Sequence, residues 1–113
     1  MSKLRYDWDD VSEDQPMPGI CRRLIRGEKA MLSRVVLVAG TIVPAHSHEN
    51  EQFAVLLSGR MLFTLGEEEE EVELFPGQVL HLPSNLKHSA IAAEDSVVLD
   101  VFSPPSDKTG IDR

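Results

Sequence analysis

Short hydrophobic runs separated by polar turns fill the chain from about residue 20 onward. Val, Leu, Ile, Met and Phe dominate these runs, and Gly, Pro, Asn or acidic residues end them. The runs occupy residues 30–39, 53–59, 60–66, 71–77, 78–85, 87–93 and 96–105. A strand roughly every 8 to 12 residues, with no sustained helical period, predicts an all-β sandwich or barrel.

The two ends of the chain depart from this pattern. Residues 1–18 are mostly polar and include two prolines, which predicts an N-terminal arm. Tyr6 and Trp8 suggest that this arm packs on its own domain or on a partner subunit. Residues 106–113 predict a loosely held tail, so the barrel is expected over 19–105. A chain of 113 residues is long enough for one core only.

Composition and charge narrow the classes of partner. The formal net charge of −8, with no basic stripe, argues against binding to nucleic acid or to anionic lipid. No apolar run approaches the roughly 20 residues that span a bilayer, and the polar N-terminus lacks a signal peptide, which favours a cytoplasmic location. The single cysteine, Cys21, allows no internal disulfide and is expected to be a small, partly buried residue. The acidic run 67–71 is interpreted as a solvated hairpin turn.

Two histidines one residue apart suggest a metal site. On a strand, His46 and His48 would point to the same face, and Gln52 would share it. Glu49 and Glu51 would face the opposite way, so the alternation favours Gln52 over Glu51 as a further ligand. A third imidazole would have to come from a distant strand, and His81 and His88 are the remaining histidines.

The spacing around these histidines resembles the first motif of the cupin superfamily, G-x5-HxH-x3 or 4-E-x6-G. The match begins at Gly40, passes through His46, His48 and Gln52, and ends at Gly59. Each spacing fits, and Gln52 takes the position of the motif's Glu.

The second cupin motif, G-x5-PxG-x2-H-x3-N, matches from Gly77 through Pro83 and His88 to Ala92. Asn85 replaces a turn glycine, a position that Asn tolerates because it can enter the left-handed region. Ala92 replaces the final Asn. Two motifs in register imply an all-β fold with a single cupin barrel, a jelly roll also described as a double-stranded β-helix.

The resemblance implies a ligand set. Cupins hold a divalent metal with the two histidines and the Glu of the first motif and the histidine of the second. By position these are His46, His48, Gln52 and His88. Imidazole and amide donors suit one divalent transition metal, and Ni, Mn, Fe, Co and Zn all remain open. His81 lies outside this set and is expected to be structural or on the surface.

An aspartate in the last apolar run is the candidate for acid–base chemistry. Asp100 shares its face with Val98 and Phe102, and a carboxylate in such a strand is costly unless it is paired or functional. This run, together with the first motif, also resembles the small pectin-degradation cupins. These enzymes hold their metal with three His and one Gln, and they open 4,5-unsaturated uronates to linear keto sugars. The resemblance implies catalysis by Asp100 and a substrate contact from Phe102.

One position departs from that subgroup, which carries an Arg shortly after its last strand. This chain has Pro105, Ser106 and Asp107 there, and Lys108 is the nearest cation. Arg60 is therefore predicted as the substrate-binding residue, with Arg22 as a second candidate.

Two other classes of function stay open. One is an oxygen-using cupin such as a dioxygenase, which would need Fe, Mn or Ni and a more apolar pocket. The other is a non-enzymatic cupin that binds a small ligand. In each case the partner is a small molecule, and dimerisation through sheet contacts and the arm predicts a homodimer.

Overall fold

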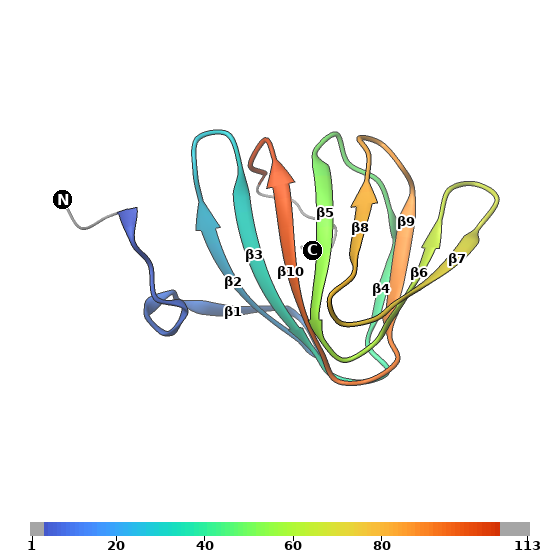
Figure 1. The fold of residues 1–113 in the computed structure, drawn as a ribbon, viewed down its shortest axis with the longest axis horizontal. Coiled ribbons are helices and arrows are strands. Elements are labelled where there is room, and N and C mark those ends of the chain that lie inside the picture. The colour runs from blue at the N-terminus through green and yellow to red at the C-terminus, as the bar shows by residue number, and fades with distance from the viewer. Residues whose placement is uncertain (1–3, 107–113) are drawn as a thin grey trace.

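Two antiparallel sheets make up the protein, as a computed structural model that describes residues 4–106 shows (Figure 1). One sheet has six strands in the order β1-β2-β3-β10-β5-β8, and the other has four in the order β4-β9-β6-β7. The strands are β1 (Glu13–Met17), β2 (Ile20–Arg26), β3 (Met31–Leu37), β4 (Ile42–His46), β5 (Glu51–Ser58), β6 (Met61–Leu65), β7 (Glu70–Leu74), β8 (Val79–Leu82), β9 (His88–Ala92) and β10 (Ser96–Ser103).

The expected all-β fold is confirmed. The inner faces of the two sheets meet in one hydrophobic core, because side chains alternate along each strand and every second one points inward. On β10, for example, Val98 and Phe102 are buried, whereas Val97 and Leu99 on the other face keep part of their surface exposed. Residues from both sheets contribute to this core, among them Val35, Leu56, Met61 and Phe63.

The N-terminal segment contains a strand that the hydrophobic pattern does not predict. Trp8–Asp10 forms a short 3-10 helix, and β1 then pairs with β2 at the edge of the larger sheet. The strand is polar and contains Pro16, which is tolerated because the β1–β2 register is irregular between Asp14 and Met17. Two hydrogen bonds from the buried Arg22 to the Asp14 carboxylate, 3.1 and 2.7 Å long, fasten the strand. Residues 1–3 of the expected arm and 107–113 of the expected tail lie outside the described residues.

Tight turns close the ends of the barrel. The acidic run forms the predicted hairpin turn between β6 and β7, with Gly66 and Glu69 at positive φ. Gly59, between β5 and β6, has a φ of 91°, and a Cβ there would lie 2.3 Å from the carbonyl oxygen of Asp95. Only glycine fits at this position, because both the backbone angle and the close approach exclude a side chain. No helix in the described part of the chain is long and apolar enough to cross a membrane.

Candidate metal centre

Three histidines converge at one end of the barrel. His46 ends β4 and His88 begins β9, and the two are partners in the antiparallel register of these strands. His48 lies in the loop that follows β4. The ring centroids of His46 and His88 are 4.3 Å apart, and that of His48 lies 5.1 Å from His88. One ring nitrogen from each of the three falls within 4.8 Å of the others, so the imidazoles can share one ion.

Backbone carbonyls orient all three rings in the same way. The Nδ1 atoms of His46, His48 and His88 lie 2.8, 2.9 and 2.9 Å from the carbonyl oxygens of Pro44, Asn50 and Leu86. A carbonyl can only accept a hydrogen bond, so each Nδ1 carries the proton. In each neutral ring the Nε2 lone pair is then available as a ligand, the arrangement that supports histidines at metal sites.

Gln52 completes the donor set from β5. Its side chain is buried, and its Oε1 lies 3.1 Å from Nε2 of His48. Its Nε2 donates a 2.9 Å hydrogen bond to Oδ1 of Asp100, which turns the amide oxygen toward the histidines. Two lone pairs therefore face each other across the gap between Gln52 and neutral His48. Such a pair is favourable with a cation in reach of both atoms, or with a proton on His48.

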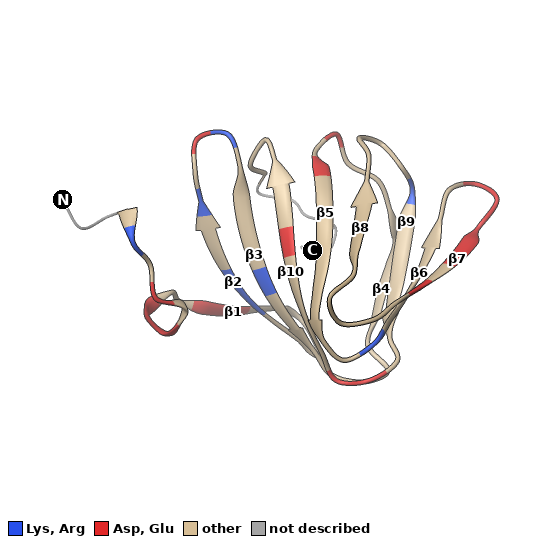
Figure 2. Cartoon of the chain, viewed as in Figure 1, with Lys and Arg blue, Asp and Glu red and all other residues tan. Residues whose placement is uncertain are grey.

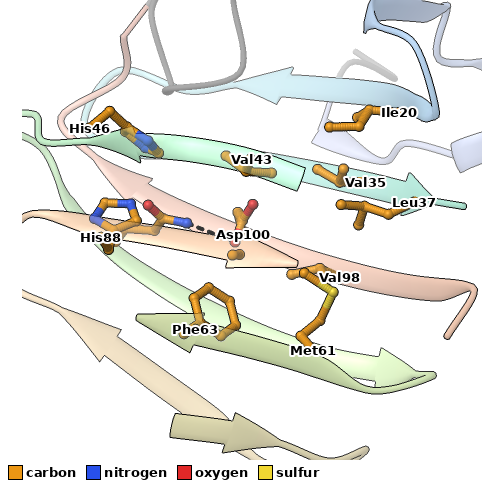
Figure 3. Close-up of a pocket in the computed structure, with 12 residues that line it drawn as sticks. Ile20, Val35, Leu37, Val43, His46, Met61, Phe63, His88, Val98 and Asp100 are labelled. Atoms are coloured by element: carbon orange, nitrogen blue, oxygen red, sulfur yellow. Dashed lines mark hydrogen bonds between the residues drawn. The ribbon is translucent and has the colours of Figure 1, made fainter. Parts of the chain in front are cut away.

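Asp100 faces the cavity beside this donor set, as the dashed bond in Figure 3 shows. Burial raises the pKa of its carboxyl from the ordinary 3.8 to about 7, and the hydrogen bond from Gln52 opposes that rise. A carboxyl poised near neutrality can both take up and release a proton at physiological pH.

His88 is the most buried of the three histidines. Burial lowers the pKa of its imidazole from 6.5 to about 4, while the bond to the Leu86 carbonyl opposes this change and His46 and His48 reinforce it. The neutral, ligating form of His88 is thus the stable one over most of the pH range.

The cavity between the sheets has polar groups at one end only. Its volume is about 50 Å³, room for a few water-sized atoms. His46, His88, Gln52 and Asp100 supply the polar groups, and the rest of the wall is hydrophobic (Figure 3). The hydrophobic lining comes from Ile20, Val35, Leu37, Val43, Met61, Phe63, Ala90 and Val98.

The donor set fits a divalent transition metal. Nitrogen and oxygen ligands lie about 2.0 to 2.2 Å from such an ion, so neighbouring ligand atoms lie roughly 3 to 4 Å apart. The Gln52–His48 separation of 3.1 Å and the span of at most 4.8 Å between the imidazole nitrogens are close to these values. Three neutral imidazoles and an amide oxygen suit borderline metals better than Ca²⁺ or Mg²⁺, which prefer oxygen ligands.

The structure brings most of the predicted site residues together. Phe102 is buried beside the cluster, with its ring centroid 5.8 Å from that of His48. His81 is exposed on the outer face, where it is 2.6 Å from a carboxylate oxygen of Glu51 and stacks on Phe53. Glu51 thus points away from the imidazoles, as the alternation of side chains predicts.

Arg60 is the predicted site residue that the structure places elsewhere. It precedes Met61, which pairs with Ala92, whereas His88 lies at the other end of β9. The carboxylates of Glu73 and Glu94 hold its guanidinium, at 2.5 and 3.3 Å. The prediction of Arg60 as a contact for the substrate is therefore corrected. The residue type suits an anion, but the strand register carries it to the opposite end of the barrel.

The second arginine candidate also has another contact, since Arg22 is buried against Asp14. Lys108, the cation nearest to the last strand in the sequence, lies outside the described residues.

Asn50 is a contributor that the motifs do not mark. It is buried, its carbonyl accepts from His48, and its side-chain amide donates to the carbonyl of Pro104. The amide therefore ties the His48 loop to the segment after β10. The one signal for Asn50 in the sequence is its spacing of two residues from His48 and from Gln52, which places the three on the same face of an extended chain.

Comparisons with known proteins agree with this geometry. The model of the Cupin domain family matches residues 33–102. Among solved structures, KdgF from Halomonas sp. is 30% identical with a TM-score of 0.81, and the alignment covers 88% of this chain and 92% of that one. None of the curated proteins compared with the chain matches it.

Two more distant structures show the fold alone. An RmlC-like cupin from Shewanella frigidimarina is 16% identical with a TM-score of 0.84, and the alignment covers 91% of this chain and 92% of that one. An oxalate decarboxylase variant from Bacillus subtilis is 22% identical with a TM-score of 0.80, over 92% of this chain and 30% of that one.

Proposed function

The chain belongs to the cupin domain family, and from this we propose that it is a metal-dependent enzyme acting on a small sugar acid. The reaction we propose opens the ring of a 4,5-unsaturated uronate to the linear keto form. This substrate class comes from the resemblance of the first motif and the last strand to the small pectin-degradation cupins. Identity of 30% to KdgF over nearly the whole of both chains supports it.

One observation carries the proposal: the carboxyl of Asp100, which can transfer a proton, is hydrogen-bonded to Gln52 of the metal-ligand set. Asp100 accepts from the amide of Gln52, and the same amide turns its oxygen toward His48. A substrate held at the histidines would thus meet, within one side chain's length, a carboxyl whose pKa of about 7 suits both proton uptake and release.

The reaction needs one proton moved and no oxidant. Asp100, as carboxylate, takes the proton of the anomeric hydroxyl, and the bond between C1 and the ring oxygen breaks to give an aldehyde. The electron pair of that bond leaves with the ring oxygen as an enolate. Asp100, now protonated, returns the proton to C4, and the enolate becomes a ketone. The product is an isomer of the substrate, so atoms and electrons balance.

His46, His48, Gln52 and His88 would hold the metal. When bound, it supplies Lewis-acid stabilisation of negative charge on the carboxylate and ring oxygen of the substrate. Phe102 packs against His48 and would limit the space beside the sugar ring. Because the cavity is only about 50 Å³, a uronate would sit at its histidine end and in the mouth beyond.

A cation at the histidine end of the cavity would bind the negatively charged carboxylate of the substrate. Lys29 lies in the turn between β2 and β3, and its carbonyl accepts a 2.7 Å bond from Ser103 at the end of β10. Phe102, one residue earlier, pairs with Gln52, so the turn borders the histidine end. We propose Lys29, whose backbone this bond places at the histidine end, as a cation for the substrate's carboxylate.

The hydrophobic wall of the cavity favours a second candidate, an oxygen-using cupin. An apolar space next to three imidazoles suits a small apolar molecule such as O₂ better than it suits a sugar. That reaction would consume oxygen, whereas ring opening would not.

Ultraviolet absorbance of a 4,5-unsaturated galacturonate separates these functions. Purified protein should remove the absorbance of the conjugated double bond well above the spontaneous rate, and a chelator should abolish the effect. Oxygen uptake, followed in parallel with an electrode, should be nil. No acceleration by metal-loaded protein would refute the uronate assignment, and oxygen uptake with a candidate substrate would establish the second function.

A matched pair of variants tests the role of Asp100. Asp100→Asn should lower kcat by at least about 100-fold, the usual contribution of a general acid or base. Asp95→Asn makes the same chemical change at an exposed site on the turn before β10, and should leave kcat unchanged. Equal loss in both variants, or none in either, would remove Asp100 from the mechanism.

A further inference from the structure

Four turns lie at the end of the barrel that holds the histidines. Strand register places them there, because Leu65 pairs with His88 at the start of β9, and Met31 pairs with Phe102 near the end of β10. The turns cover residues 27–30, 47–50, 66–69 and 83–87. Figure 2 shows red segments on three of these turns, so acidic side chains gather at the histidine end.

These turns and the strand ends beside them carry more carboxylates than cations. Within residues 4–106 the carboxylates are Glu28, Glu49, Glu51, Glu67, Glu68, Glu69 and Glu70, and the cations are Arg26, Lys29 and Lys87. We call these residues the acidic rim. Its seven carboxylates against three cations give a net charge of −4. The turns at the opposite end of the barrel carry one cation and two carboxylates: Arg60, Glu94 and Asp95. Of the two ends, the histidine end is therefore the more negative.

The acidic rim reaches the ligand set itself. The amide of Gly66 donates a 2.8 Å hydrogen bond to the carbonyl of Lys87, which fastens the most acidic turn beside His88. Glu69, Lys87 and His88 line one cavity of about 150 Å³. His88 also lines the cavity inside the barrel. The carboxylate of Glu69 and a metal ligand thus border a common space.

Two features of the ligand set point independently to a cation. His88 is 4% exposed, its Nδ1 bonds to the carbonyl of Leu86, and its Nε2 makes no hydrogen bond in the described part of the chain. The amide oxygen of Gln52 and Nε2 of His48 present lone pairs to each other across 3.1 Å. Buried lone pairs that receive no hydrogen bond are costly, and a positive ion satisfies them. The acidic rim therefore borders a site that lacks a positive charge.

The charge of the acidic rim raises the local concentration of divalent cations. The electrostatic energy of an ion grows with its charge, so a divalent ion gains twice as much from the rim as a monovalent one. Fields of this kind speed association by about 10- to 1,000-fold at low ionic strength, and salt screens them. A hydrated metal ion must also exchange water for imidazole at the site, and a higher local concentration gives more encounters in which that exchange can occur.

We infer that the acidic rim steers divalent metal ions from solution to His46, His48, Gln52 and His88. This inference rests on the ligand set of the proposed function and not on its substrate. The same field opposes the approach of an anion, so the rim speeds metal uptake and gives no such help to a uronate.

The rate of Co²⁺ uptake by the metal-free full chain tests the inference. Bound Co²⁺ absorbs visible light according to its ligands, so stopped-flow absorbance gives the second-order rate constant of association. The rim variant combines Glu67→Gln, Glu68→Gln and Glu69→Gln. At an ionic strength of about 0.1 M it should take up Co²⁺ at least about 3-fold more slowly than wild type, and the difference should vanish near about 1 M.

A matched triple variant separates the position of the charges from the net charge. Glu73→Gln, Glu94→Gln and Asp95→Asn also remove three carboxylates, but near Arg60 at the opposite end of the barrel. The strand β9 alone spans about 13 Å between the two ends, so these charges lie beyond the screening length of about 10 Å at about 0.1 M. Uptake by this control should match wild type.

Lys87→Gln tests the sign of the effect. It removes a cation next to His88, so uptake should be about twofold faster than wild type at about 0.1 M. Release of Co²⁺ into excess chelator should be similar in all variants, because charges at a rim change the association rate more than the dissociation rate. If the rim variant loses its circular dichroism spectrum, Lys87→Gln decides the sign alone.

Each result decides the inference. Equal uptake by wild type and the folded rim variant at low salt overturns it, as does equal slowing in the matched control. A wild type that takes up no Co²⁺ overturns it together with the ligand set. Uptake that depends on the rim supports the inference even if no uronate is turned over, which separates it from the proposed substrate.

Discussion

Removal of the buried carboxyl should change how the stability of the metal-free protein depends on pH. Asp100 has a pKa of about 7 in the folded chain against an ordinary 3.8. Since the folded value is raised, the carboxyl contributes stability below about pH 4 that is lost as the pH rises through 7. Each pH unit in that window costs about 1.36 kcal/mol, so the whole window costs about 4 kcal/mol.

The assay is urea unfolding at about pH 5 and about pH 8, after metal has been removed by chelation and dialysis. The stability contribution of Asp100 falls between pH 5 and its pKa of about 7, a range of about two pH units. From pH 5 to pH 8 the free energy of unfolding of the wild type should therefore fall by about 2.7 kcal/mol more than that of Asp100→Asn. His88 acts in the opposite sense, because its pKa is lowered to about 4 and its contribution is lost as the pH falls. It is present in both proteins and cancels in their difference.

Asp95→Asn serves as the control for the loss of one carboxylate. Asp95 is exposed, and its Oδ1 accepts a 2.8 Å bond from the amide of Ala39, which an asparagine oxygen can also accept. This variant should follow wild type at both pH values. A difference between wild type and Asp100→Asn that stays constant from pH 5 to pH 8 would show that Asp100 is not buried as a costly charge.

Three further outcomes follow from the site and the barrel. His88→Ala should lose bound metal after dialysis, as elemental analysis would show, and metal content equal to wild type would contradict the ligand set. Gln52→Glu should keep the metal but lose turnover, because the variant replaces the amide that donates a hydrogen bond to Asp100 with a second carboxylate. An unchanged kcat would show that Asp100 does not depend on its hydrogen bond from Gln52. Gly59→Ala and Gly40→Ala both place alanine at a φ near 90°, which costs about 1 to 2 kcal/mol, but only Gly59 also meets backbone oxygen at 2.3 Å. Gly59→Ala should therefore have a lower melting temperature than Gly40→Ala, by roughly 4 to 8 °C for each kcal/mol of additional destabilisation from the steric clash. Equal melting temperatures of the two variants would contradict the close approach of the Asp95 carbonyl to Gly59.

Periodicity in the sequence is enough to predict the β architecture, because alternation of apolar residues is a local property. It does not predict β1, because the residues of this strand are polar. The position of β1 depends on the ion pair between Asp14 and Arg22 of the neighbouring strand β2. It also leaves β4 unmarked as an apolar run, since this strand is short and half-exposed.

The prediction of the metal ligands depends on the alternation of side chains along the strand and on contacts between residues that are distant in the sequence. Strand alternation selects Gln52 over Glu51, and the structure agrees, although β4 ends at His46 and His48 lies in a loop. The alternation persists across the loop because Asn50, through its carbonyl and its amide, holds that loop against the barrel.

Residue types and their spacing along the chain are what the sequence by itself determined: an all-β barrel, two cupin motifs, and a candidate set of His46, His48, Gln52 and His88. Only the tertiary structure decided which groups meet. Pairing of β10 with β5 places Asp100 in reach of Gln52, and the register of β6 carries Arg60 away from the histidines. The physical reason is that chemistry at the site depends on distances of a few ångströms between residues 48 positions apart, and strand order and register fix those distances.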